Sequence, residues 1–111
     1  MKLDILALGA HPDDVELTCS GTLLKAMLNG KKAGIIDFTR GELGTRGTPE
    51  IRMAEANAAA DVLGISAREN LRFRDGFIQN DEAHQLEVIK MLRKYQPDIV
   101  LANAVRDRHP D

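Results

Sequence analysis

The amino-acid sequence predicts an α/β fold, in which a parallel sheet carries helices on both faces. The composition supports one ordinary globular domain, because 43% of the 111 residues are hydrophobic and 29% are charged. Short apolar runs alternate along the chain with segments of helical periodicity, in the order β-α-β-α-β-α-β. Parallel strands are joined by right-handed crossovers, so we expect a Rossmann-like sheet whose ligands bind at the carboxyl ends of the strands.

The first half of the chain contains two predicted strands and the helix that joins them. Residues 3–8 (LDILAL) form a short apolar run closed by a glycine, which is typical of a buried strand. Residues 15–29 repeat leucines at helical spacing and end at an Asn-Gly pair, where a helix commonly stops. Residues 33–39 (AGIIDFT) are apolar and partly β-branched, and predict a second strand that leads into a glycine-rich loop at residues 40–47.

The second half repeats the same alternation. A Thr-Pro pair is a well-formed helix start and predicts a helix over residues 49–63, which a glycine ends. Residues 70–74 (NLRFR) alternate like a short strand. A third helix is expected to begin at residues 80–81 and to stop before Pro97, and residues 99–102 then form a fourth, buried strand.

Composition and charge exclude several classes of function. A net charge of −2 and 4% aromatic residues offer neither a basic surface nor stacking platforms, so nucleic acid is not an expected partner. No apolar run approaches the ~20 residues of a membrane helix, and Lys2 and Asp4 interrupt the segment where a signal peptide would be apolar. We therefore expect a cytoplasmic protein without a membrane partner.

A histidine and two aspartates follow the first predicted strand, in the turn Gly-Ala-His-Pro-Asp-Asp at residues 9–14. A catalytic zinc ion takes about three protein ligands from His, Asp or Glu and keeps one position for water. His11 and one of the aspartates, Asp13 or Asp14, can supply two ligands, and the other aspartate can act as a general base. The alternative interpretation is that one aspartate merely caps the following helix.

A second histidine-containing turn, Arg-Asp-Arg-His-Pro-Asp at residues 106–111, follows the fourth predicted strand in the same way. In a doubly wound sheet the two turns can converge on one cleft, which predicts a shared site. A Rossmann-type nucleotide-binding module is the rival interpretation, but the first turn lacks the G-x-G-x-x-G spacing. Two carboxylates at the entry to the first helix would also repel a pyrophosphate.

These motifs resemble those of the LmbE-like (PIG-L) zinc N-deacetylases, and most closely the bacillithiol-biosynthesis deacetylases that act on N-acetylglucosaminyl malate. The resemblance covers essentially the whole chain and is carried by residues 9–16 (GAHPDDVE), Gly41-Glu42, Gly47-Thr48 with Arg52 and Glu55, and residues 107–111 (DRHPD). Chains of that family are about twice as long. The resemblance therefore implies that residues 1–111 are the N-terminal portion of one LmbE-like domain.

The resemblance implies a role for each residue of the two turns. His11 and Asp14 would bind Zn²⁺, and Asp13 would be the general base. His109 would polarise the acetyl carbonyl or stabilise its oxyanion, with Asp111 orienting the imidazole. The family's third metal ligand is a histidine directly after the position of Asp111, so we expect the chain to end one residue before it. The polypeptide alone would then be a poor enzyme or an inactive fragment.

The resemblance also suggests residues that contact substrate. Arg52 would face it, and an arginine fork suits a carboxylate such as malate; the alternative is a pair with Glu55 on an exposed helix face. Glu42 could bind sugar hydroxyls, Asp75 could hold a partner of the metal ligands, and Arg108 is a further candidate. The expected reaction is hydrolysis of the N-acetyl group of an N-acetylglucosaminide with release of acetate. An unpaired edge on the fourth strand would favour a homo-oligomer.

Overall fold

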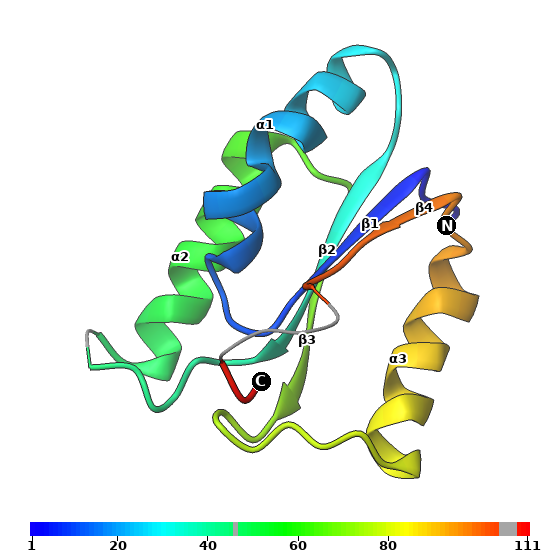
Figure 1. Ribbon diagram of the computed structural model, residues 1–111. Coiled ribbons are helices and arrows are strands. Elements are labelled where there is room, and N and C mark those ends of the chain that lie inside the picture. Colours follow the sequence, from blue (N-terminus) through cyan, green and yellow to red (C-terminus); the bar gives the residue numbers. More distant parts are fainter. Residues whose placement is uncertain (46, 105–108) are drawn as a thin grey trace.

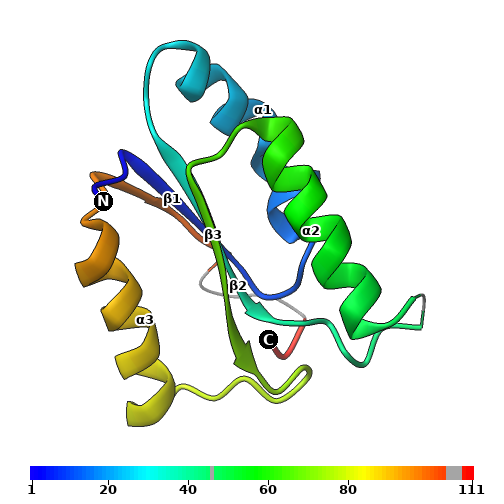
Figure 2. The same ribbon diagram turned by 180° about the vertical axis from the view of Figure 1, so that it is seen from behind.

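A four-stranded parallel sheet forms the centre of the protein, in the strand order β3-β2-β1-β4. The computed structural model describes residues 1–45, 47–104 and 109–111. Helices α1 and α2 cover one face of the sheet and α3 covers the other (Figure 1, Figure 2). The predicted α/β class and the order of elements are confirmed, the elements being β1 (Ile5–Gly9), α1 (Asp14–Leu28), β2 (Ala33–Thr39), α2 (Pro49–Leu63), β3 (Ala67–Phe73), α3 (Glu82–Tyr95) and β4 (Ile99–Leu101).

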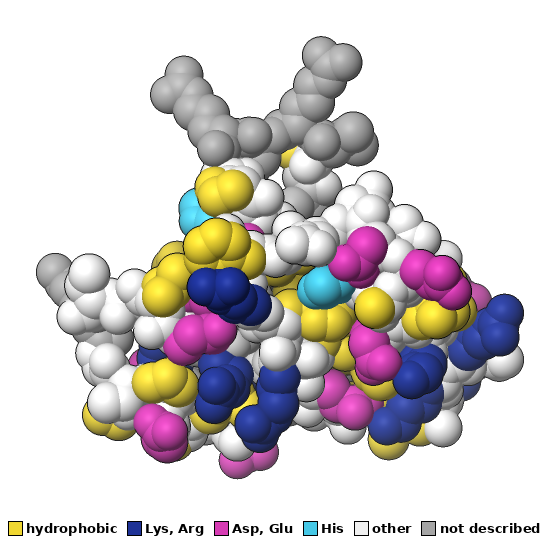
Figure 3. Space-filling model, turned by 90° about the horizontal axis from the view of Figure 1, so that it is seen from below, with side chains coloured by type: hydrophobic (Ala, Val, Ile, Leu, Met, Phe, Trp, Pro, Cys, Tyr) yellow, Lys and Arg dark blue, Asp and Glu magenta, His cyan; other side chains and the backbone are white. Residues whose placement is uncertain are grey.

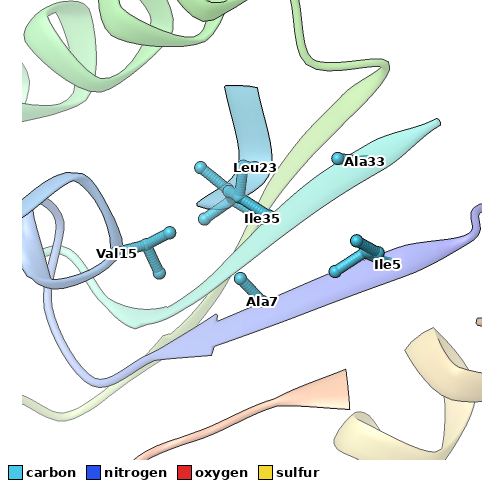
Figure 4. Close-up of a cluster of buried hydrophobic side chains, with 6 residues drawn as sticks. All are labelled: Ile5, Ala7, Val15, Leu23, Ala33 and Ile35. Atoms are coloured by element: carbon cyan, nitrogen blue, oxygen red, sulfur yellow. The ribbon is translucent and has the colours of Figure 1, made fainter. Parts of the chain in front are cut away.

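The two faces of the sheet bury alternate residues of the strands, because successive side chains of a strand point to opposite sides. On the face of α1, Val15 and Leu23 pack against the odd-numbered residues of β1 and β2 (Figure 4). On the face of α3, Tyr95 packs against Leu6 and Ile36. Both central strands are therefore buried on both sides, which explains why their sequences are nearly continuous apolar runs.

The helices begin where local capping residues place them. The side chain of Thr48 accepts a hydrogen bond from the Ile51 amide at 3.1 Å, so α2 starts at Pro49 as predicted. Asp81 caps α3 in the same manner through the His84 amide at 2.9 Å. Within the described ranges, no helix is both long and apolar enough to cross a membrane.

Strand β3 begins at Ala67, three residues before the predicted start at residue 70. The prediction missed Arg68 and Glu69, because two charged residues in succession are unusual in a strand interior. In the structure Glu69 accepts hydrogen bonds from Tyr95 and Lys94, and Arg68 is buried in an ion-pair cluster. Long-range partners thus permit a strand that the local sequence disfavours.

The ion-pair cluster of Arg68 connects four elements of the fold. The guanidinium donates to Asp37 of β2 at 2.8 and 3.0 Å, to Glu16 of α1 at 3.0 and 3.1 Å, and to the Ala56 carbonyl of α2 at 3.2 Å. Its side chain is 5% exposed and that of Asp37 is 3% exposed. Burial raises the pKa of Asp37 above its ordinary value, and the hydrogen bonds from Arg68 oppose this shift without cancelling it.

Two predictions about β1 and β4 were wrong. The chain enters β1 at Ile5 rather than at residue 3, because the Leu3 amide donates to the Tyr95 carbonyl outside the sheet. The fourth strand is not buried, since Ile99 is 53% and Val100 is 44% exposed. It lies at the edge of the sheet and pairs with β1 alone among the described strands.

Candidate metal and catalytic site

The loops that follow the strands meet at the carboxyl end of the sheet. Both His-Pro-Asp turns lie there and line one cavity of about 1150 Å³, to which His11, Asp14, His109 and Asp111 contribute. Figure 3 views the molecule from this end, where the visible acidic and basic side chains are interspersed. The structure thus brings together the two turns that are about 100 residues apart in the sequence, as the topology predicted.

The turn between β1 and α1 presents two carboxylates in different ways. Asp14 accepts a hydrogen bond from the His11 amide at 3.0 Å, which closes the turn. Asp13 occupies the N-cap position with φ = 89°, but its side chain makes no capping bond to the described backbone and is 60% exposed. A left-handed conformation costs a residue other than glycine about 1–3 kcal/mol and is concentrated at functional sites. Helix capping therefore does not account for Asp13.

Three carboxylates surround the imidazole of His11, one from the first residue of α1 and two from the segments that follow β3 and β4. Its Nε2 lies 2.9 Å from both Asp75 Oδ1 and Asp111 Oδ2, and its Nδ1 lies 3.5 Å from Asp14 Oδ2. Burial alone would lower the pKa of His11, but the bond to Asp111 and the three negative charges outweigh it and raise the pKa. A single imidazole among three carboxylates is an environment that attracts a cation, either a proton or a metal ion.

Asp111 is held by the loop that follows β3. Its carboxylate accepts hydrogen bonds from the Gly76 amide at 2.8 Å and the Ile78 amide at 3.2 Å. Burial alone would raise the pKa of Asp111, but these amides together with His11 outweigh it, so the net shift of the pKa is downward. The two amide donors were not predicted, although an Asp-Gly pair is typical of such a turn.

His109 contacts both turns. The rings of His109 and His11 meet edge to face with centroids 4.9 Å apart. The main-chain amide of Asp111 donates to His109 Nδ1 at 3.1 Å, whereas the carboxylate of Asp111 points to His11. Asp111 thus contacts His109 through its main-chain amide, and the role of Asp111 in orienting the His109 imidazole stays a prediction.

The donor atoms of the site suit a divalent cation. His11, His109 and Asp111 offer ligand atoms within 4.8 Å of one another, and imidazole nitrogen with carboxylate oxygen is a common zinc donor set. The predicted pair of His11 and Asp14 also fits, because its 3.5 Å separation is close to that of two ligands on one tetrahedral zinc ion, about 3.3–3.5 Å. The 2.9 Å contacts of Nε2 are instead typical hydrogen-bond distances.

Arg52 connects the first turn with the loop after β2. Its guanidinium donates to the Gly41 carbonyl at 2.8 Å and the Pro12 carbonyl at 3.0 Å, and lies 3.9 Å from Asp13 Oδ2. It therefore points into the site rather than toward Glu55. Burial raises the pKa of Asp13, and the Arg52 charge opposes this, but Asp14 adds to it, so the net pKa of Asp13 is raised.

Glu42 and Asp75 hold each other in place beside His11. Glu42 Oε2 accepts the Asp75 amide at 2.9 Å, and Asp75 Oδ2 accepts the Leu43 amide at 2.8 Å. Glu42 Oε1 is buried and has no hydrogen-bond partner among the residues that the structure describes. Both candidates thus lie at the site, whereas Arg108 lies outside the described residues.

The fold and the site together define an α/β protein with a cluster of histidine and aspartate that could hold a cation at the carboxyl ends of parallel strands. Comparison with known proteins identifies the particular family. Residues 6–111 match the PIG-L family, GlcNAc-PI de-N-acetylase, and the chain belongs to this family. This membership replaces the Rossmann-type nucleotide-binding module that the sequence alone left open.

Individual relatives resemble this chain over nearly its whole length. The diacetylchitobiose deacetylase of Thermococcus kodakarensis is 28% identical in an alignment of 105 positions that covers 87% of this chain and 39% of that protein. The conserved protein TT1542 from Thermus thermophilus is 44% identical with a TM-score of 0.91, over 97% of this chain and 49% of its own. GalB, the 4-carboxy-2-hydroxymuconate hydratase from Pseudomonas putida KT2440, is 25% identical with a TM-score of 0.85, over 99% and 52%. The chain spans about two-fifths of the length of the curated relatives that it matches.

Proposed function

We propose that this chain carries the metal site and the general base of an N-deacetylase, which hydrolyses the N-acetyl group of an amino sugar and releases acetate. The observation that carries the proposal is the imidazole of His11 among three carboxylates, beside the strained and exposed Asp13. The name of the Thermococcus relative, diacetylchitobiose deacetylase, supports an N-acetylated sugar as the substrate class. N-Acetylglucosaminyl malate, a precursor in bacillithiol biosynthesis, is the specific substrate that we propose.

We assign the zinc ligands to His11 and Asp14, with the third ligand at the position directly after Asp111. The separation of His11 Nδ1 from Asp14 Oδ2 supports this assignment. Asp111 is the weaker candidate because both of its oxygens already accept amide hydrogen bonds from the loop after β3. When bound, zinc supplies Lewis-acid chemistry that polarises the acetyl carbonyl and makes water more acidic.

The remaining residues of the two turns act on the attacking water and on the acetyl carbonyl. Asp13 accepts a proton from the attacking water, since its carboxylate is exposed and its raised pKa makes it a stronger base than an ordinary aspartate. The water oxygen bonds to the acetyl carbon, and His109 donates a hydrogen bond to the developing oxyanion. The C–N bond then breaks, the amine takes the proton from Asp13, and acetate leaves.

Substrate contacts are assigned to the loop after β2 and its neighbours. The buried Oε1 of Glu42 is an acceptor that a sugar hydroxyl could satisfy, because buried polar atoms are normally hydrogen-bonded. Arg52 uses two of its five N–H groups on main-chain carbonyls, which leaves donors for a substrate carboxylate. Arg108 is proposed to bind substrate as well. The exposed edge strand β4 is the surface through which we propose association with another copy.

The test compares the full-length gene product with a His11→Ala variant. The wild-type protein should bind zinc and release acetate from an N-acetylglucosaminide, and His11→Ala should lose both the metal and the activity. His84→Ala is the matched control, because His84 lies in α3 and contacts Asp81 and Phe73 instead of the metal site. Full activity in His11→Ala would refute the proposed function.

Hydration of a carbon–carbon double bond is the second candidate reaction. The similarity to the Pseudomonas hydratase, at 25% identity, favours it as an alternative. A carboxylate base beside a cation site could direct water to either an amide carbon or an activated alkene. Conversion of an unsaturated hydroxy acid without acetate release from any N-acetylated sugar would select this reaction over deacetylation.

A further inference from the structure

We propose that Asp75 is a positioning residue that, together with Asp111, fixes the tautomer of His11 and so favours Nδ1 as the nitrogen that binds the metal. The inference rests on the proposed function. Asp75 Oδ1 lies 2.9 Å from His11 Nε2, and Asp75 Oδ2 accepts the Leu43 amide at 2.8 Å. The Asp75 side chain is 9% exposed. Both oxygens are thus engaged, and the carboxylate has little freedom to turn away from the imidazole.

The main chain of Asp75 is held as firmly as its side chain. Its amide donates to Glu42 Oε2 at 2.9 Å, while its carboxylate accepts from the amide of Leu43, the residue next to Glu42. These two bonds run in opposite directions between the loop after β2 and the loop after β3. We call this pair of bonds the Glu42–Asp75 clasp. It keeps Asp75 beside His11 without any contribution from the metal.

The chemistry of the contact determines the tautomer. An ionised carboxylate only accepts hydrogen bonds, so the Nε2 atom, which is hydrogen-bonded to Asp111 Oδ2 and also faces Asp75 Oδ1, carries the hydrogen. The lone pair that can bind the metal is then on Nδ1, which lies 3.5 Å from Asp14 Oδ2. A carboxylate partner also makes the metal-binding nitrogen more basic, and loss of such a partner typically weakens metal binding about 10–100-fold.

Asp111 Oδ2 is the hydrogen-bond partner of His11 Nε2 at 2.9 Å, and the charge of Asp75 at the same distance adds to its effect. Because the bond to Asp111 remains when Asp75 is changed, Asp75 accounts for only part of the preference for a hydrogen on Nε2. The expected loss for Asp75→Asn therefore lies nearer to about 10-fold than to 100-fold. The asparagine can still accept the Leu43 amide, but its NH₂ group no longer forces the hydrogen onto Nε2.

The first measurement is the zinc dissociation constant of the full-length protein, by competition with a chelator. Asp75→Asn should bind zinc about 10-fold more weakly than wild type. Asp61→Asn, which removes one negative charge from the exposed face of α2, should bind as wild type does. Thermal unfolding of the metal-free proteins checks that each variant is folded. Unchanged affinity in a folded Asp75→Asn, with wild type active, overturns this inference and leaves the proposed function standing.

The second measurement reads the tautomer directly. Two-bond ¹H–¹⁵N correlation spectra of the zinc-loaded protein should show His11 with a protonated Nε2 and a metal-bound Nδ1. The reverse assignment overturns the inference even if the affinity falls, because a merely structural role of Asp75 would not determine the nitrogen. A wild-type protein that binds no zinc overturns the proposed function, and the role of Asp75 falls with it.

Discussion

Substitution of Arg68 by methionine provides the sharpest test of how the fold is held together. The change removes a guanidinium that is 5% exposed and leaves the carboxylate of Asp37, 3% exposed, without its cation. Removing one partner of a buried ion pair costs about 3–5 kcal/mol, because the remaining charge is buried and unpaired. Glu16 is 21% exposed and adds less, since water can solvate it. We therefore expect a loss of about 3–5 kcal/mol in the free energy of unfolding at neutral pH.

The loss should depend on pH in a defined direction. The pKa of Asp37 in the folded protein already lies above its ordinary value because of burial, and removal of Arg68 should raise it further. For a group with a raised folded-state pKa, the stabilising contribution is complete below the unfolded-state pKa and is lost as the pH rises through the folded-state pKa. The difference between Arg68→Met and wild type should thus be largest at neutral pH and shrink as the pH falls and Asp37 becomes protonated.

Urea denaturation followed by circular dichroism measures both effects. Arg93→Met is the control, because Arg93 is exposed on α3 and its replacement should change stability by less than about 0.5 kcal/mol. The double variant Asp37→Leu/Arg68→Met should recover most of the lost free energy of unfolding, since residue 37 then carries no buried charge. A cost below about 1 kcal/mol for Arg68→Met, or a cost independent of pH, would refute the reasoning.

Three further predictions concern the site and the helices. Asp13→Gly should stabilise the protein by about 1 kcal/mol, because glycine adopts the left-handed backbone at φ = 89° without strain. The same change should abolish acetate release by the full-length protein, because it removes the proposed base. Denaturation and rate measurements test the two effects, and retained activity would exclude Asp13 as the base. Gly41→Ala should destabilise the fold and impair activity, because Gly41 has φ = 64° and the added Cβ would lie 2.2 Å from Arg52 Nη1. Gly21→Ala is the control: no atom lies near the added Cβ in the interior of α1, so the fold should gain about 0.5–1 kcal/mol. Equal effects of the two variants in thermal unfolding would contradict this prediction. Thr48→Ala should cost about 1 kcal/mol through loss of the α2 cap, and an unchanged denaturation midpoint would argue against it.

The parts of the fold that the sequence predicted are those with local causes. The bounds of α2 follow from the cap at Thr48, the proline after it and the glycine at residue 64, all of which act within one turn. The start of β3 was missed because Arg68 and Glu69 are acceptable in a strand only with partners on other elements. The burial of residues 99–102 was overestimated because an apolar run does not reveal whether its strand is central or at an edge.

In the site, too, features with local causes could be predicted from the sequence, and contacts between distant residues could not. The two His-Pro-Asp turns were recognisable because each follows a predicted strand, and the parallel topology brings such turns together. The contact of Asp75 with His11 joins residues that are far apart in the chain, and it depends on the conformation of two loops that no local pattern specifies. For the same reason, the sequence could not show that the Asp111 carboxylate meets His11 while its amide meets His109.

The Glu42–Asp75 clasp couples the loop after β2 to the candidate metal site at His11. A ligand that moved Glu42 would also move the Asp75 amide, which is bonded to it, and the Asp75 carboxylate that faces His11. If such a ligand changes the affinity for the metal by some factor, the metal must change the affinity for that ligand by the same factor. The proposed binding of a sugar at Glu42 and the proposed binding of the metal at His11 should therefore strengthen or weaken together.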